Sequence, residues 1–147
     1  MNKKGKDKNL VNSKLVRLLS QMDTEEIKQF KSFIKVKGKK SMDALQVLKY
    51  LFSVHPTYTS RQLTNEVVYK KVFPSQPFSY PRLMKAVSLA HSDLKQFLIA
   101  DLLQKDTFLS DYLLAKVYAQ KRLSHDLSLL LEKKNTHLIP ILTPNTI

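Results

Sequence analysis

The feature that most constrains the fold is the stretch from residue 81 to residue 105, which contains no glycine and no internal proline. Its apolar residues recur every three or four positions, the spacing of one helical face: Leu83, Val87, Ala90, Leu94, Leu98 and Leu102. A helix of this extent would be roughly 37 Å long. We therefore predict that this helix organises the domain.

The other segments also show helical periodicity, and no segment alternates polar and apolar residues for long enough to form a strand. Only two of the 147 residues are glycine, which disfavours the positive-φ turns of β-hairpins. We predict an all-α, single-domain bundle of six or seven helices over residues 13–135. A flexible basic tail at 1–12 precedes it, and an irregular apolar tail with two prolines at 136–147 follows it.

Helix starts are marked by side chains that can accept hydrogen bonds from free backbone N–H groups. Asp23 with Glu26 forms one predicted capping box, and Thr59 with Gln62 forms a second. Ser41 is a predicted single cap. These positions place helix starts near residues 24, 42 and 60.

The residues available for catalysis are few. The chain has no cysteine, and its histidines at 55, 91, 125 and 137 do not share a metal-binding spacing. No glycine-rich phosphate loop is present, and no apolar run approaches the length of a membrane span. We therefore expect a non-enzymatic cytoplasmic protein that needs no cofactor or metal.

The net charge of +13 arises from 25 basic and 12 acidic residues. Most of the excess lies in residues 1–40, which hold 12 basic and four acidic residues. A field of this sign attracts nucleic acid, anionic membrane or acidic protein. Only four of the basic residues are arginine, and reading of base edges relies on arginine more than on lysine. The bias towards lysine favours unspecific attraction or a solvated surface.

A first basic cluster consists of Lys28, Lys31 and Lys35. Their spacing puts them on one helical face, opposite Ile27, Phe30 and Ile34. This face is interpreted either as a phosphate-binding ridge or as an ordinary solvated surface.

A second basic cluster surrounds the proline-rich stretch 70–87. Predicted helices at about 42–55, 60–72 and 80–105 follow the order of a helix-turn-helix core. In that interpretation the nucleic-acid contacts would be Arg61, Lys70, Lys71, Tyr80, Arg82 and Lys85. The connection from Phe73 to Ser79 exceeds the three or four residues typical of the motif. We therefore favour the other interpretation, a rigid structural corner in which the aromatic residues pack, and keep the nucleic-acid contacts as the alternative.

The segments "MDTEEIKQFKSFI" and "ALQVLKYLFSVHPTYTSRQLTNEVVYKKVFPSQPFSYPRLMKAVSLAHSDLKQFLIADLLQKD" carry a recognisable pattern. It resembles the N-terminal region of largely helical bacterial proteins of unknown function. The matching positions are Phe30, Phe33, Tyr69, Phe73, Pro74, Pro77, Phe78, Arg82, Leu83, Ser88, Leu94, Phe97 and Leu98. The resemblance implies a helical architecture, often followed by tetratricopeptide-like helices, and implies no catalytic residues.

Together these observations predict a non-catalytic helical interaction module that binds protein partners or self-associates. The apolar residues at 138, 139, 141 and 142 support that expectation. The alternative is a nucleic-acid-binding domain that uses the second basic cluster. Membrane attachment is disfavoured, because no basic amphipathic helix carries an aromatic insertion face.

Overall fold

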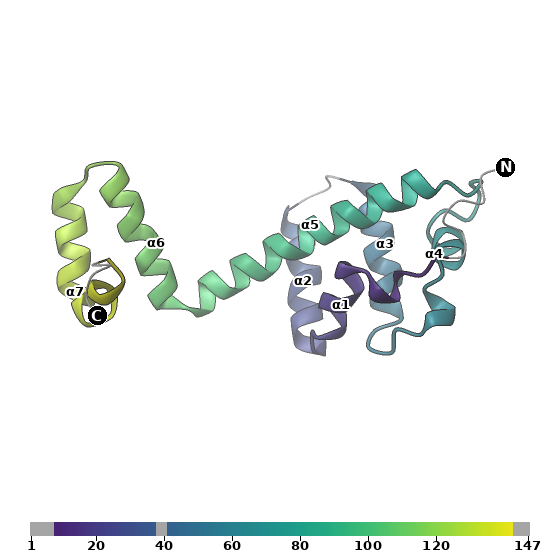
Figure 1. Cartoon of the computed structure of the whole chain (residues 1–147), viewed down its shortest axis with the longest axis horizontal. Coiled ribbons are helices and arrows are strands. Elements are labelled where there is room, and N and C mark those ends of the chain that lie inside the picture. Colours follow the sequence, from purple (N-terminus) through teal and green to yellow (C-terminus); the bar gives the residue numbers. More distant parts are fainter. Residues whose placement is uncertain (1–7, 38–40, 143–147) are drawn as a thin grey trace. The chain divides into compact units, whose positions relative to one another are not determined.

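The computed structural model describes residues 8–37 and 41–142, with side chains described for residues 8–37 and 41–133. The described residues are helical apart from their connections, which confirms the predicted all-α class (Figure 1). They form seven α-helices and two 3₁₀ helices: η1 Leu10–Asn12, α1 Lys14–Ser20, α2 Thr24–Lys37, α3 Met42–Ser53, η2 Ser60–Gln62, α4 Asn65–Val72, α5 Tyr80–Lys105, α6 Thr107–Gln120 and α7 Ser124–Leu142.

The chain divides into two compact units, residues 1–97 and residues 98–147, where the sequence predicts a single domain. The long helix α5 has the predicted extent, but its buried face ends at Phe97. Beyond that point Ile99 and Leu102 are exposed, although Leu102 belongs to the predicted apolar stripe. Apolar spacing predicts a helical face, and the number of neighbouring helices decides how much of that face is covered.

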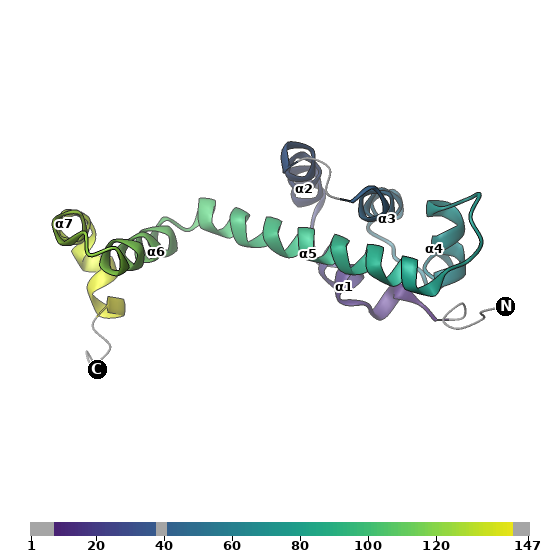
Figure 2. The same ribbon diagram turned by 90° about the horizontal axis from the view of Figure 1, so that it is seen from above.

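In the first unit, α2, α3 and α4 lie along one side of the first part of α5, and α1 lies on the other side (Figure 2). Side chains from all of these helices form the core. Those fully buried include Leu15, Leu19, Phe30, Leu48, Leu51, Val68, Leu83 and Leu94.

Residues 8–12 were predicted to belong to a flexible tail, and the structure instead docks them on the first unit. The Leu10 N–H donates to the Leu63 carbonyl at 2.8 Å, and the Asn65 N–H donates to the Lys8 carbonyl at 2.8 Å. The side chain of Leu10 is buried. Backbone pairing and apolar burial together hold this short segment in place.

The predicted helix at 60–72 is interrupted, because residues 63–65 pair with the N-terminal segment. The structure has the short 3₁₀ helix η2 followed by the separate helix α4. Thr64 begins α4 by accepting from the Val67 N–H at 3.2 Å. The Thr59 N–H does bond the Gln62 side chain at 3.4 Å, so the predicted cap belongs to a 3₁₀ turn.

Two other predicted helix starts are confirmed. At α2, the Glu26 N–H donates to Asp23 at 2.8 Å and the Asp23 N–H donates to Glu26 at 3.2 Å, a complete capping box. At α3, the Ser41 hydroxyl accepts from the Ala44 N–H at 3.1 Å.

The second unit contains the end of α5 and the paired helices α6 and α7, which lie side by side in Figures 1 and 2. Asp106 caps α6 by accepting from the Leu109 N–H at 2.9 Å. Helix α7 continues to Leu142, where an irregular tail was predicted from residue 136. A proline this far into a helix loses one backbone hydrogen bond and crowds the carbonyl four residues earlier, so the helical backbone at Pro140 is not what the sequence pattern predicts. The side chains at 138, 139, 141 and 142 lie outside the described residues.

Candidate functional site

A groove of about 630 Å³ lies between α2 and α3 in the first unit. Its floor is apolar and is formed by Ile34 from α2 and by Leu45, Leu48 and Phe52 from α3. Leu48 is fully buried, whereas the other three side chains are half-buried. The floor is therefore apolar surface that this unit covers only in part.

The sequence produces this floor by helical spacing. Leu45, Leu48 and Phe52 are three and four residues apart, so they share one face of α3. That face is wider than the core needs, because Val47 and Leu51 already fill the interior on its other side. The part of this apolar face that the core does not use lies beside α2 and forms the floor of the groove.

Three exposed lysines form the rim of the groove: Lys31 and Lys35 from α2 and Lys49 from α3. The Lys31 ammonium lies 5.2 Å from the centroid of the Phe52 ring, within the range of a cation–π interaction. Asp93 from α5 also lines the groove. Its carboxylate lies 3.1 Å from the ammonium of Lys37, so its charge is already matched. The rim therefore has a positive field.

Helix α2 is fixed to the rest of the unit at two levels. Phe30 stacks on Phe97 with ring centroids 5.2 Å apart and meets Phe52 edge-on at 5.7 Å. Nearer the end of α2, Lys37 binds Asp93 and also donates to Gln96. These contacts set the spacing between α2 and α3 before any ligand arrives.

The groove contains two members of the predicted phosphate ridge. Lys31 and Lys35 line it together with Ile34, so the prediction that these lysines lie opposite Ile34 is wrong. Lys28 is exposed on α2 and does not line the groove. Sequence reasoning did not single out Lys49. Its spacing could have identified it, because Lys49 follows Leu45 by four residues and therefore shares the helical face of Leu45.

Arg82, a predicted nucleic-acid contact, is engaged within the unit. Its guanidinium donates to both carboxylate oxygens of Asp43, at 2.9 and 3.1 Å. The guanidinium carbon also lies 4.1 Å from the centroid of the Phe73 ring. The hydrogen bond that Arg82 donates to Asp43 raises the pKa of Arg82. Arg82 thus links the start of α5 to the start of α3, and contact with nucleic acid would have to compete with this pair.

The aromatic residues of the proline-rich stretch pack together around that pair. Tyr69 has its ring centroid 4.7 Å from that of Phe73 and 5.2 Å from that of Phe78. Tyr69 and Phe73 are buried. This packing has the form of the structural corner that the sequence favours for this stretch.

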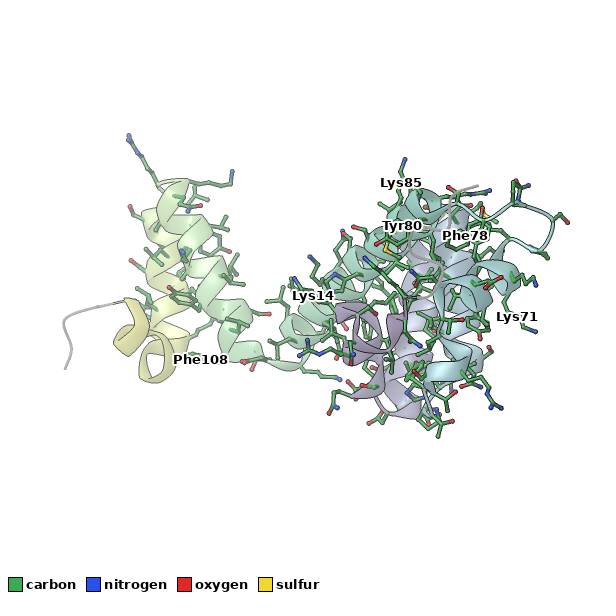
Figure 3. The ribbon with its side chains drawn as sticks, turned by 45° about the vertical axis from the view of Figure 1, so that its right-hand side comes forward. Lys14, Lys71, Phe78, Tyr80, Lys85 and Phe108 are labelled. Carbon is green, nitrogen blue, oxygen red and sulfur yellow. The ribbon has the colours of Figure 1, made fainter. Side chains whose placement is uncertain are left out.

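The remaining predicted nucleic-acid contacts lie around this corner. Arg61, Lys70, Lys71 and Lys85 are exposed, and Lys71 and Lys85 point away from the helices in Figure 3. Tyr80 is half-buried, with the Lys8 ammonium 5.7 Å from its ring centroid. Lys70 and Lys71 lie at the end of α4 and Tyr80 and Lys85 in the first turns of α5, on either side of the corner, whereas Arg61 lies in η2.

Within the described ranges, no three His, Cys, Asp or Glu side chains are grouped so that they could hold a metal ion. No helix among the described residues has the length and apolar character needed to cross a membrane.

No protein-family model matches the chain, and no curated protein or solved structure shows significant similarity to it.

Proposed function

We propose that this chain is a helical interaction module that binds a segment of another protein in the groove between α2 and α3. The observation that carries the proposal is the apolar floor of Ile34, Leu45 and Phe52, which remains partly open to solvent in a folded unit. Removing such surface from water is the main favourable term in most protein association.

The fixed position of α2 supports the same proposal. A groove whose walls are already held in place requires little ordering when a ligand enters, and this lowers the entropic cost of binding. The contacts of Phe30 and Lys37 provide this preorganisation.

The proposal is tested by selecting binders from a random library of displayed peptides against the full chain. Each selected peptide is then measured against two variants, Leu45→Gln in the groove floor and Leu89→Gln, which alters an exposed leucine of α5 outside the groove. We expect Leu45→Gln to weaken binding at least tenfold and Leu89→Gln to change it less than twofold. Equal affinities for both variants would refute the groove as the binding site.

Nucleic-acid binding is the second candidate function, and the exposed Lys70, Lys71 and Lys85 at the α4–α5 corner favour it, with Arg61 exposed in η2. It is measured by fluorescence anisotropy with labelled oligonucleotides between about 50 and 200 mM salt. Binding that persists at about 150 mM and weakens when Lys70, Lys71 and Lys85 are replaced would support it. Binding that disappears at that salt concentration would remove it.

A further inference from the structure

Resting on the proposed function, we infer that the groove accepts an acidic amphipathic helix of a partner protein. Charge is the first argument. Lys31, Lys35 and Lys49 surround the floor and are exposed, and the lining carboxylate of Asp93 is already paired with Lys37. A segment that fills this groove must bring its flanking residues close to three ammonium groups, so aspartate and glutamate are favoured there and lysine and arginine are opposed.

The length of the groove suits one face of a helix. Along α3 the lining extends from Ser41 to Ser53, a rise of about 18 Å at 1.5 Å per residue. Anchors at i, i+4 and i+7 of a partner helix span about 10 Å. A helix lying along the groove can therefore place all three anchors over the apolar floor.

The backbone of the partner supplies the reason for a helix instead of an extended strand. Both walls of the groove are helices, whose interior N–H and C=O groups are already hydrogen-bonded, so the groove offers no row of free backbone partners. An extended segment pressed against the apolar floor would lose water from its own backbone without replacement. A helix satisfies its backbone internally and presents anchors at i, i+3 or i+4, and i+7.

Two other occupants are disfavoured by charge. The chain's own first residues include Lys3, Lys4 and Lys6, which the lysine rim would repel. A second copy also carries a net charge of +13. An acidic segment of another protein is the occupant that complements both the floor and the rim.

The test uses three synthetic peptides of about 18 residues and the full chain. The first peptide has leucines at i, i+4 and i+7 with glutamate elsewhere on its sides. The second replaces each glutamate with lysine, and the third scrambles the acidic sequence so that it has no apolar face. By isothermal calorimetry at about 150 mM salt, we expect the acidic amphipathic peptide to bind at least tenfold more tightly than either control.

Charge-reversed variants locate the effect on the protein. The rim triple Lys31→Glu, Lys35→Glu and Lys49→Glu is compared with a matched triple, Lys70→Glu, Lys71→Glu and Lys85→Glu, which changes the net charge equally outside the groove. We expect at least a tenfold loss of affinity in the rim triple and less than a threefold loss in the matched triple. Circular dichroism establishes that both variants fold.

The outcomes separate this inference from the proposed function. If Leu45→Gln abolishes peptide binding but the acidic and basic peptides bind equally, the inference is overturned and the groove remains a binding site. If both charge-reversed triples weaken binding equally, the attraction is general and the inference is also overturned. If no peptide, acidic or selected from the library, responds to Leu45→Gln, the proposed function itself fails.

Discussion

Phe30 offers the sharpest test of how the groove is held, because one side chain joins α2 to both α3 and α5. Its side chain is fully buried, and its ring pairs with Phe52 and with Phe97. Replacement of a buried phenylalanine by alanine removes apolar burial and leaves a cavity, at a cost of about 3–5 kcal/mol in the free energy of unfolding. That is a large fraction of the ~5–15 kcal/mol that stabilises an ordinary domain.

A second variant separates the volume of Phe30 from its ring contacts. Phe30→Leu keeps most of the apolar volume but loses the two ring pairs, each worth about 1 kcal/mol beyond the burial of area. We therefore expect Phe30→Leu to lower the free energy of unfolding by about 2 kcal/mol, roughly half the effect of Phe30→Ala. The variant should remain folded at room temperature, so its peptide affinity can be measured.

The assay is amide hydrogen exchange followed by mass spectrometry, which reports each helix separately in a chain with two compact units. Peptides from α2 and α3 should lose protection in Phe30→Ala, and peptides from α6 serve as the internal reference. The control is Val36→Ala on the same helix, because Val36 is 88% exposed and should cost almost nothing. The reasoning is refuted if the free energies of unfolding of Phe30→Ala and Val36→Ala differ by less than about 1 kcal/mol.

Three further predictions concern charge and protonation. Burial and the nearby charge of Lys95 lower the pKa of His91. As the pH drops below about 6.5, this histidine is protonated in the unfolded chain before it is protonated in the folded chain, so the melting temperature should fall. The fall in melting temperature should be smaller in His91→Gln. Burial raises the pKa of Tyr58 to about 12. The unfolded chain then ionises first above pH ~10, and the loss of stability between about pH 10 and 12 should be smaller in Tyr58→Phe. If oligonucleotides bind, Lys85→Ala should reduce the slope of log affinity against log salt concentration by about one phosphate contact. Arg82→Ala should leave this slope unchanged, because the Arg82 guanidinium is already paired with the Asp43 carboxylate.

Features that depend on neighbours in the sequence were predictable. The capping box of Asp23 and Glu26 and the extent of α5 follow from residues within one or two turns of each other. The interruption of the helix predicted at 60–72 was not predictable in this way. It depends on hydrogen bonds between residues 63–65 and the segment near Leu10, and no local pattern reports that pairing.

The candidate site shows the same division. The shared face of Lys31 and Lys35 was predicted from their spacing, but the apolar floor beside it depends on where α3 packs against α2. Likewise, Arg82 and Asp43 are 39 positions apart, so their pairing is visible only in the folded unit. Sequence spacing identified the basic surface, and tertiary packing shows which parts of it adjoin apolar surface.

That distinction bears on the class of partner more strongly than the net charge of +13 does. A phosphate backbone is attracted by exposed lysines, but it gains nothing from an apolar floor and would lose its hydration there. The lysines at the α4–α5 corner surround packed aromatic residues, whereas Lys31, Lys35 and Lys49 surround side chains that remain half-open. Only a ligand with both carboxylates and aliphatic side chains can use both components of the groove. For such a ligand, Leu45→Gln in the floor and reversal of the rim charges should each weaken binding. The loss caused by charge reversal should shrink as the salt concentration rises, because salt screens the rim charges. The loss caused by Leu45→Gln should not shrink in this way.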